Sequence, residues 1–351
     1  MHMTLRWFGK LDPIPLEHIR QIPGVSGVVT SLMHIPAGEV WPLDACERMR
    51  DEIHAAGLTA EVIESVNIHE DIKLGVPERD GRIEQYVETL ENLSSAGIKV
   101  VCYNFMPVLD WARSHLFYDL PDGSNTMYFS REFIQNTTPE KLAARYAEQS
   151  GGVALPGWEP ERLKDIVATV ERYKDISQEQ YWENARYFLQ KVIPRAERLG
   201  VKMAIHPDDP PWPLFGLPRL INSRDNIRRF LNLYPSPCNG LTLCTGSLGA
   251  DPGNDVPAIV REFADRIYFA HIRNLKYLDN GDFYESAHPA RCGSLDMPRI
   301  VRALARRGFD GYIRPDHGRM IWGETGRAGY GLYDRAMGAA YLTGLWEAFT
   351  T

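Results

Sequence analysis

Residues 202–207 read Lys-Met-Ala-Ile-His-Pro, a short β-prone run that ends on a histidine and is stopped by a proline. Three later segments have the same form and close on or near a side chain that can bind a metal: Leu241-Thr242-Leu243-Cys244-Thr245, Ile267-Tyr268-Phe269-Ala270-His271 and Tyr312-Ile313-Arg314-Pro315-Asp316-His317. A parallel barrel assembles a metal site at its mouth by placing one such residue at each strand end. The four segments therefore predict a barrel and a metal centre together.

The same pattern extends over the chain as an alternation of β-prone runs and amphipathic helical stretches. The expected strands are Leu5–Gly9, Gly27–Leu32, Ala60–Val66, Val100–Phe105, Lys202–His206, Gly240–Thr245, Ile267–Ile272 and Gly311–Arg314. The expected helices are Leu16–Gln21, Leu43–Ala56, Arg82–Ala96, Gln178–Leu199, Arg224–Leu233, Val256–Ala264, Pro298–Arg306 and Tyr333–Phe349. Eight such units predict an α/β fold, a (β/α)8 TIM barrel that forms a single domain over residues 1–351. A doubly wound sheet is the alternative if the first strand or the first helix does not form.

One connection, residues 106–177 after the fourth strand, is far longer than an ordinary βα loop. Its expected parts are a hairpin at Leu116–Phe129, helices at Pro139–Gln149 and Pro160–Tyr173, and a flexible Ser150-Gly151-Gly152 link. The segment leaves from the end of a strand where barrel active sites form. We therefore expect an inserted lid or dimerisation segment within the barrel domain.

Composition excludes several classes of protein. The net charge of −7 and the lack of a Lys/Arg cluster argue against a nucleic-acid partner. No apolar stretch reaches the roughly 18–20 residues of a membrane span, and Met1–Arg6 lacks the apolar core of a signal peptide, so we expect a cytoplasmic protein with no membrane partner. We set Met1 and His2 aside as a cloning remnant. Five cysteines without a C-x-x-C pair indicate free thiols or metal ligands.

The four strand-end residues His206, Cys244, His271 and Asp316 each have an ordinary explanation when taken singly. A strand-end histidine is usually a hydrogen-bonded structural residue, and a cysteine among apolar residues is usually a small buried side chain. Four residues of ligand type at equivalent ends of consecutive strands favour one shared divalent ion instead. The thiolate favours Zn²⁺ or Fe²⁺ by its softness.

Two arginines near these ligands, Arg273 and Arg314, suggest an anionic substrate whose carboxylate they hold with paired hydrogen bonds. Salt bridges to Asp208, Asp209 or Glu64 are an equally weighted alternative.

Two further candidates for the site are His317, which directly follows Asp316, and Tyr330, which lies in a glycine-flanked loop before the last helix. The tyrosine could reach inward to the site, although a loop tyrosine by itself usually serves packing.

Several longer segments carry a resemblance to a known family. They are Arg6-Trp7-Phe8-Gly9, Gly27-Val28-Val29-Thr30, Ile68-His69-Glu70-Asp71-Ile72-Lys73, residues 101–111, His206-Pro207-Asp208-Asp209-Pro210-Pro211, Cys244-Thr245-Gly246-Ser247 and Arg314-Pro315-Asp316-His317-Gly318. Over nearly the whole chain the sequence resembles the metal-dependent D-mannonate dehydratases of hexuronate breakdown. The resemblance implies a xylose isomerase-like barrel that removes water from D-mannonate, with 2-keto-3-deoxy-D-gluconate as product and Mn²⁺ or Fe²⁺ as the ion.

The resemblance also implies roles for individual residues. The family's metal ligands match His206, Cys244, His271 and Asp316, and its acid–base pair matches His317 and Tyr330. Dehydration of a sugar acid needs removal of the hydrogen next to the carboxylate and protonation of the departing 3-hydroxyl, and a His and a Tyr on opposite sides of the substrate would suit these tasks. Arg273 and Arg314 would anchor the carboxylate or a hydroxyl, and Asn104 would hydrogen-bond the sugar chain.

Two other functions stay open from the sequence. A sugar or sugar-acid isomerase or epimerase would use the same barrel and metal, and a non-catalytic ligand-binding protein would keep the ion for structure. The expected partner is the small-molecule substrate, D-mannonate, in a homo-oligomer for which a dimer is favoured. Zn²⁺ is a further ion that purified protein could carry.

Overall fold

The computed structural model describes residues 1–150, 155, 157–158 and 166–350. Eight parallel strands close into a barrel in the order β1-β12-β9-β8-β7-β4-β3-β2. They are β1 (His2–Arg6), β2 (Val25–Thr30), β3 (Thr59–Glu64), β4 (Val100–Tyr103), β7 (Lys202–Ile205), β8 (Asn239–Cys244), β9 (Ile267–His271) and β12 (Tyr312–Arg314). The predicted TIM barrel is confirmed, and the doubly wound alternative is wrong because β1 pairs with both β2 and β12.

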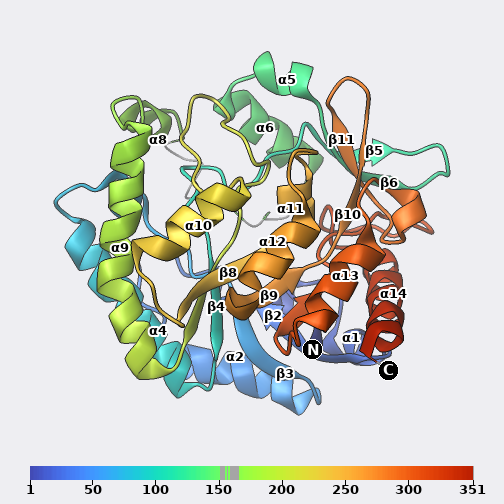
Figure 1. Ribbon diagram of the computed structural model, residues 1–351, viewed down its shortest axis with the longest axis horizontal. Helices are drawn as coiled ribbons and strands as arrows, with labels where there is room; N and C mark the ends of the chain where they lie inside the picture. The colour runs from blue at the N-terminus through green and yellow to red at the C-terminus, as the bar shows by residue number, and fades with distance from the viewer. Residues whose placement is uncertain (151–154, 156, 159–165, 351) are drawn as a thin grey trace.

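Helices surround the barrel (Figure 1). The longer ones are α2 (Leu43–Ala55), α4 (Arg79–Ser95), α9 (Gln178–Leu199), α10 (Arg224–Leu233), α12 (Val256–Phe263), α13 (Met297–Arg306) and α14 (Leu332–Thr350). Shorter pieces are α1 (Leu16–Arg20), α3 (Glu70–Leu74), α11 (Thr245–Gly249), η1 (Gly9–Leu11), η2 (Ala264–Arg266) and η3 (Ala290–Cys292). Helix α9 illustrates how the sequence sets where a helix begins and ends. The side chain of Ser177 caps its first turn, and Gly200 ends it at φ +67°, where a residue with a Cβ would be strained.

The first strand lies closer to the N-terminus than the sequence suggested. Its expected range was Leu5–Gly9, but the strand runs from His2 to Arg6 because His2 and Met3 pair with the last strand of the barrel, at Tyr312 and Ile313. His2 is therefore part of the barrel, and setting it aside was wrong. The shift makes Arg6 the final residue of β1, at the end of the barrel where active sites form.

A second, four-stranded antiparallel sheet adjoins the barrel, in the order β10-β11-β6-β5 (Figure 1). Strands β5 (His115–Asp119) and β6 (Asn125–Phe129) form the hairpin that the sequence predicted. Strands β10 (Asn274–Tyr277) and β11 (Phe283–Ser286) were not predicted and come from the loop after β9. Pairing of β11 with β6 joins this loop to the long connection after β4.

The rest of the long connection, where the structure describes it, consists of short helices joined by loops. It contains α5 (Arg131–Gln135), α6 (Pro139–Gln149) and α8 (Ile166–Arg172). Helix α6 matches its predicted range, and α8 covers the described part of the helix expected at Pro160–Tyr173 except Tyr173, which follows its last residue. Gly151 and Gly152 of the expected flexible link lie outside the described residues, as do residues 160–165.

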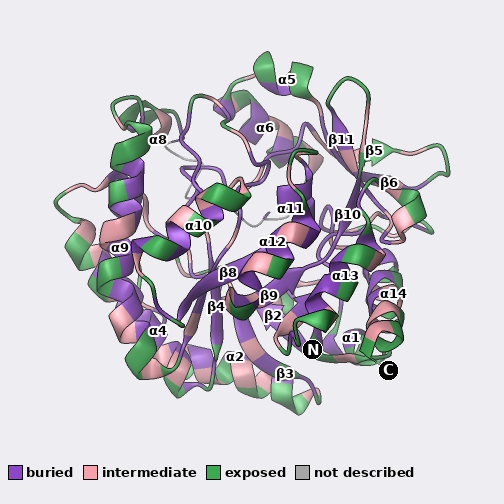
Figure 2. Ribbon diagram, in the orientation of Figure 1, coloured by how far each residue is buried: buried purple, intermediate pink, exposed green. Residues whose placement is uncertain are grey.

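Burial follows the layers of the barrel, with buried strands inside and exposed residues on the outward faces of the helices (Figure 2). A small group of inward side chains fills the barrel: Val29, Val62, Val100, Cys102, Ala204 and Phe269. A much larger apolar cluster lies between strands and helices. Among the described residues, no helix is long and apolar enough to cross a membrane.

Candidate active site and metal centre

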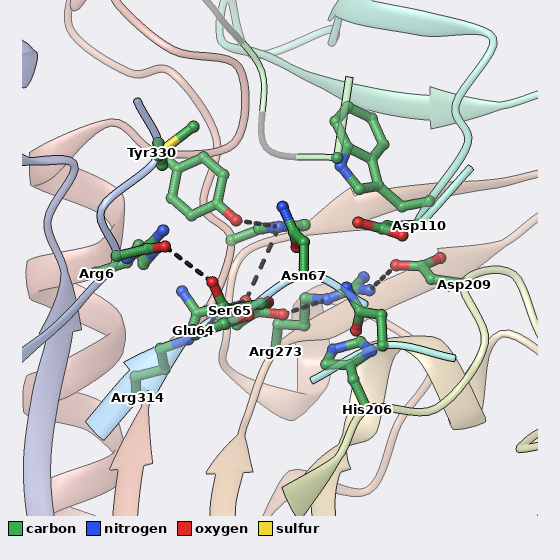
Figure 3. A pocket seen from close by; sticks show the side chains of 17 residues that line it. Arg6, Glu64, Ser65, Asn67, Asp110, His206, Asp209, Arg273, Arg314 and Tyr330 are labelled. Atoms are coloured by element: carbon green, nitrogen blue, oxygen red, sulfur yellow. Dashed lines mark hydrogen bonds and ion pairs between the residues drawn. The ribbon is translucent and has the colours of Figure 1, made fainter. Parts of the chain in front are cut away.

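A pocket opens at the carboxyl ends of the barrel strands (Figure 3). Its wall includes the final residues of β1, β3 and β12, which are Arg6, Glu64 and Arg314, and His206 just after β7. In the view of Figure 3, Arg6, Arg314 and Tyr330 lie on one side, and Asp110 and Asp209 on the other. The ends of several strands thus place charged side chains from across the barrel in one pocket.

Three of the four predicted metal ligands form a compact group. The nearest ligand atoms of His206, Cys244 and His271 all lie within 4.8 Å of one another. Nε2 of His206 is 3.2 Å from Nδ1 of His271. Ligands that bind one ion at about 2.0–2.3 Å stand roughly 3–4 Å apart, so the spacing suits a shared divalent ion. The donors, two imidazoles and a sulfur, fit a transition metal or zinc.

The ring orientations are set by contacts on the far side of each imidazole. Nδ1 of His206 lies 2.7 Å from the carbonyl oxygen of Pro207, and Nε2 of His271 lies 3.3 Å from a carboxylate oxygen of Glu64. These contacts leave Nε2 of His206 and Nδ1 of His271 directed at the common centre. Metal-binding histidines are commonly oriented in this way by a carbonyl or carboxylate.

The fourth predicted ligand, Asp316, lies beside this group with its carboxylate engaged elsewhere. Its oxygens are 3.7 Å from Sγ of Cys244 and 3.8 Å from Nδ1 of His271. Each oxygen is also 2.7 Å from a guanidinium nitrogen, one of Arg273 and one of Arg314. Burial disfavours the charged carboxylate, but these neighbours and His317 outweigh it and hold its pKa well below the usual value.

The predicted acid–base pair is in direct contact. Nε2 of His317 lies 3.1 Å from the phenol oxygen of Tyr330, and Nδ1 of His317 lies 2.8 Å from Oε2 of Glu285. The sequence suggested a His and a Tyr on opposite sides of the substrate, whereas both lie on one side of the pocket here. Burial raises the pKa of Tyr330 to about 12, so its phenol is protonated at neutral pH.

The two predicted carboxylate-binding arginines are held by acids of the barrel. Arg273 contacts Asp209 at 2.7 Å and Glu285 at 3.2 Å in addition to Asp316. Arg314 contacts Glu64 at 2.9 Å as well as Asp316. The two arginines therefore form the salt bridges to Asp209 and Glu64 that the sequence left open as an alternative. Asp208, the third acid considered, instead lies 3.7 Å from Arg219.

Arg113, which the sequence did not single out, completes this buried ion-pair network. Its guanidinium contacts Asp209 at 2.7 Å and Glu285 at 2.8 Å. Burial opposes ionisation of Glu285, but Arg273, His317 and Arg113 outweigh burial and lower its pKa to about 2. Glu285 is therefore an ionised carboxylate that links the arginines to His317.

Other pocket residues come partly from the long connection after β4. Asn104, predicted to hold the sugar chain, lines the pocket. Asp110, Trp111 and Gly157 of the connection line it too. The sequence missed Asp110 as a site residue, although its place soon after the fourth strand end was a usable signal.

Comparison with known proteins gives matches over the whole chain. The family model described as D-mannonate dehydratase (UxuA) matches residues 1–351. A mannonate dehydratase of Thermotoga neapolitana is 56% identical over 353 residues, which cover 100% of this chain and 98% of the relative.

Solved structures give the same result. The crystal structure of mannonate dehydratase from Streptococcus suis serotype 2 superimposes with a TM-score of 0.91 at 44% identity, and the match covers 99% of this chain and 95% of that one. A xylose isomerase domain protein from Planctomyces limnophilus matches with a TM-score of 0.55 at 12% identity over 99% and 98% of the two chains, which shows the shared barrel fold alone. The chain belongs to the D-mannonate dehydratase family, whose members are hydro-lyases.

Proposed function

We propose that the protein removes water from D-mannonate to give 2-keto-3-deoxy-D-gluconate, in the cytoplasmic breakdown of hexuronates such as glucuronate. The observation that carries the proposal is one pocket whose wall includes His206, which contacts the buried His271 behind it, and the hydrogen-bonded pair of His317 and Tyr330. An ion site with an adjacent pair of proton-transfer groups suits an elimination next to a carboxylate.

A divalent ion would be held by His206, Cys244 and His271, with Asp316 as the fourth ligand. The three compact donors fit such an ion, and Asp316 would exchange part of its contact with Arg273 or Arg314 for the ion. When bound, the ion supplies positive charge that stabilises the negative charge developing beside the substrate carboxylate. Mn²⁺ or Fe²⁺ is the proposed ion, and Zn²⁺ is one that purified protein could carry.

His317 and Tyr330 would divide the proton transfers. Ionised Glu285 accepts a hydrogen bond from Nδ1–H of His317, which leaves Nε2 with a lone pair that can take the proton at C2. Tyr330 keeps its proton at neutral pH and can donate it to the departing 3-hydroxyl. Each transfer is worth roughly 10²–10⁴ in rate.

The remaining groups would hold the substrate. Asn104 would hydrogen-bond the hydroxylated chain, and Arg314, whose Nε and Nη1 make no hydrogen bond within the described structure, would contribute positive charge with Arg273. Asp110 and Gly157 line the pocket, so the segment 106–177 would act as an inserted wall or lid of the site. A homodimer is the proposed assembly.

A product assay tests the proposal. Metal-loaded protein is incubated with D-mannonate, and the 2-keto-3-deoxy acid is detected by the periodate–thiobarbiturate colour. We expect product that accumulates with time and is lost when the ion is chelated. An isomerase or epimerase would consume the substrate without this colour, and a ligand-binding protein would leave D-mannonate unchanged.

A further inference from the structure

Among the described residues, Arg6 differs from the other arginines of the pocket wall in making no ion-pair contact with a carboxylate. Arg273 and Arg314 each contact at least two carboxylates. Arg6 is only 3% exposed, yet among the described residues it forms no ion pair. A buried charge without a counter-ion is costly, so its retention calls for a specific explanation.

The guanidinium of Arg6 is nevertheless held firmly in place. Its Nη1 donates to the carbonyl oxygens of Val29 at 3.1 Å and Trp7 at 3.3 Å. Its guanidinium carbon lies 4.5 Å from the centre of the Phe8 ring. The backbone carbonyl of Arg6 in turn accepts a hydrogen bond from Arg335 at 3.0 Å. These contacts use one nitrogen and leave Nε and Nη2 without a partner in the described part of the chain.

We propose that Arg6 binds the carboxylate of the substrate and so orients the sugar acid in the pocket, an inference that rests on the proposed function. Arg6 lines the pocket, and in Figure 3 it lies on the same side as Tyr330 and away from Asp110. An aldonate has a carboxylate at one end and hydroxyls along the rest. Its anionic end is matched by Arg6, and its hydroxyls are matched by the polar groups of Asn104 and Asp110.

Burial disfavours the charged guanidinium and lowers the pKa of Arg6 to about 10, because nearby Glu64 and Tyr330 compensate for burial only in part. Arg6 is still charged at neutral pH. An anion placed against Nε and Nη2 would supply the missing counter-charge in a two-pronged contact. Arg273 and Arg314 already contact carboxylates of the protein, so Arg6 is better placed than either to bind the carboxylate of a substrate.

The test compares D-mannonate with D-mannonamide, which replaces the carboxylate by a neutral group of similar size. Dissociation constants are measured by calorimetry on metal-loaded protein carrying His317→Asn, so that D-mannonate is not consumed. With Arg6 intact we expect D-mannonate to bind at least about 30-fold more tightly than the amide. When Arg6→Gln is added to the same protein, this preference should fall at least about tenfold. Adding Arg6→Lys instead should give a preference between these two values.

Arg219→Gln is the matched control. Arg219 is also buried, and it lies 3.7 Å from Asp208 and donates to the carbonyl oxygen of Leu109, but it neither lines the pocket nor contacts Arg6. This variant should lose thermal stability and keep the preference for the acid. The proposal is overturned if the protein with Arg6 intact shows no preference, if Arg6→Gln leaves the preference unchanged, or if Arg219→Gln lowers it equally. Product formation by wild-type protein separately tests the proposed function.

Discussion

Nδ1 of His317 lies 2.8 Å from Oε2 of Glu285, and this contact sets which nitrogen of the imidazole carries a proton. Glu285 is fully buried and ionised, so it can only accept a hydrogen bond, and Nδ1 must be the donor. In the neutral imidazole, Nε2 is then the acceptor that faces the phenol of Tyr330. The carboxylate comes from β11, outside the barrel, so the second sheet contributes to the orientation of His317.

Glu285→Gln should impair turnover more than substrate binding. The amide keeps the size of the side chain but can present an N–H to Nδ1 and so favour the wrong tautomer of His317. We expect kcat to fall at least about tenfold, with KM changed less than about threefold. Steady-state kinetics with D-mannonate provide the measurement. A rise in KM at unchanged kcat would show that Glu285 does not orient His317.

Acid should destabilise the fold partly through Glu285. Its folded-state pKa of about 2 is below the ordinary value of 4.5, so its contribution to stability is complete above pH 4.5 and is lost as the pH falls toward 2. That contribution is at most about 3 kcal/mol. Denaturant unfolding across this range should show a smaller pH dependence for Glu285→Gln than for wild type. Parallel curves would refute the assignment.

His317→Asn and Tyr330→Phe should each reduce turnover by about 10²–10⁴-fold. Both replacements remove a proton-transfer group and leave the three compact donors in place. Metal content by elemental analysis should therefore stay near that of wild type. Retained activity in either variant would remove that residue from the mechanism.

Cys244→Ser should weaken retention of the ion by more than about tenfold, because a hydroxyl replaces the soft thiolate. Cys102 provides the matched control: it is also buried in a barrel strand, but Thr242 donates to its sulfur at 3.2 Å inside the barrel. Cys102→Ser should leave the metal content unchanged. Equal metal content in the Cys244 variant and wild type after dialysis would argue against a ligand role.

Much of this arrangement could be predicted from local patterns. Each barrel strand is a short β-prone run, and the residues at or after the ends of β7, β8 and β9 include His206, Cys244 and His271. In a closed barrel consecutive strand ends are neighbours, so their convergence follows from the fold.

Other features depend on contacts between distant segments and had no local signal. Glu285 lies in a strand that was not predicted, and it reaches His317 because β11 pairs with β6 of the long connection. Whether an arginine meets an acid is also set by tertiary packing. Sequence spacing drew attention to Arg273 and Arg314, whereas Arg6 on the first strand is the arginine of the pocket wall that forms no ion pair within the described structure.

The position of the ion is the central claim, and anomalous X-ray scattering from crystals grown with Mn²⁺ tests it most directly. We predict one strong peak at about 2.0–2.4 Å from Nε2 of His206, Nδ1 of His271 and Sγ of Cys244. Asp316 should turn one oxygen toward the same peak. A manganese peak elsewhere in the pocket, with these three side chains still in contact only with one another, would contradict the account.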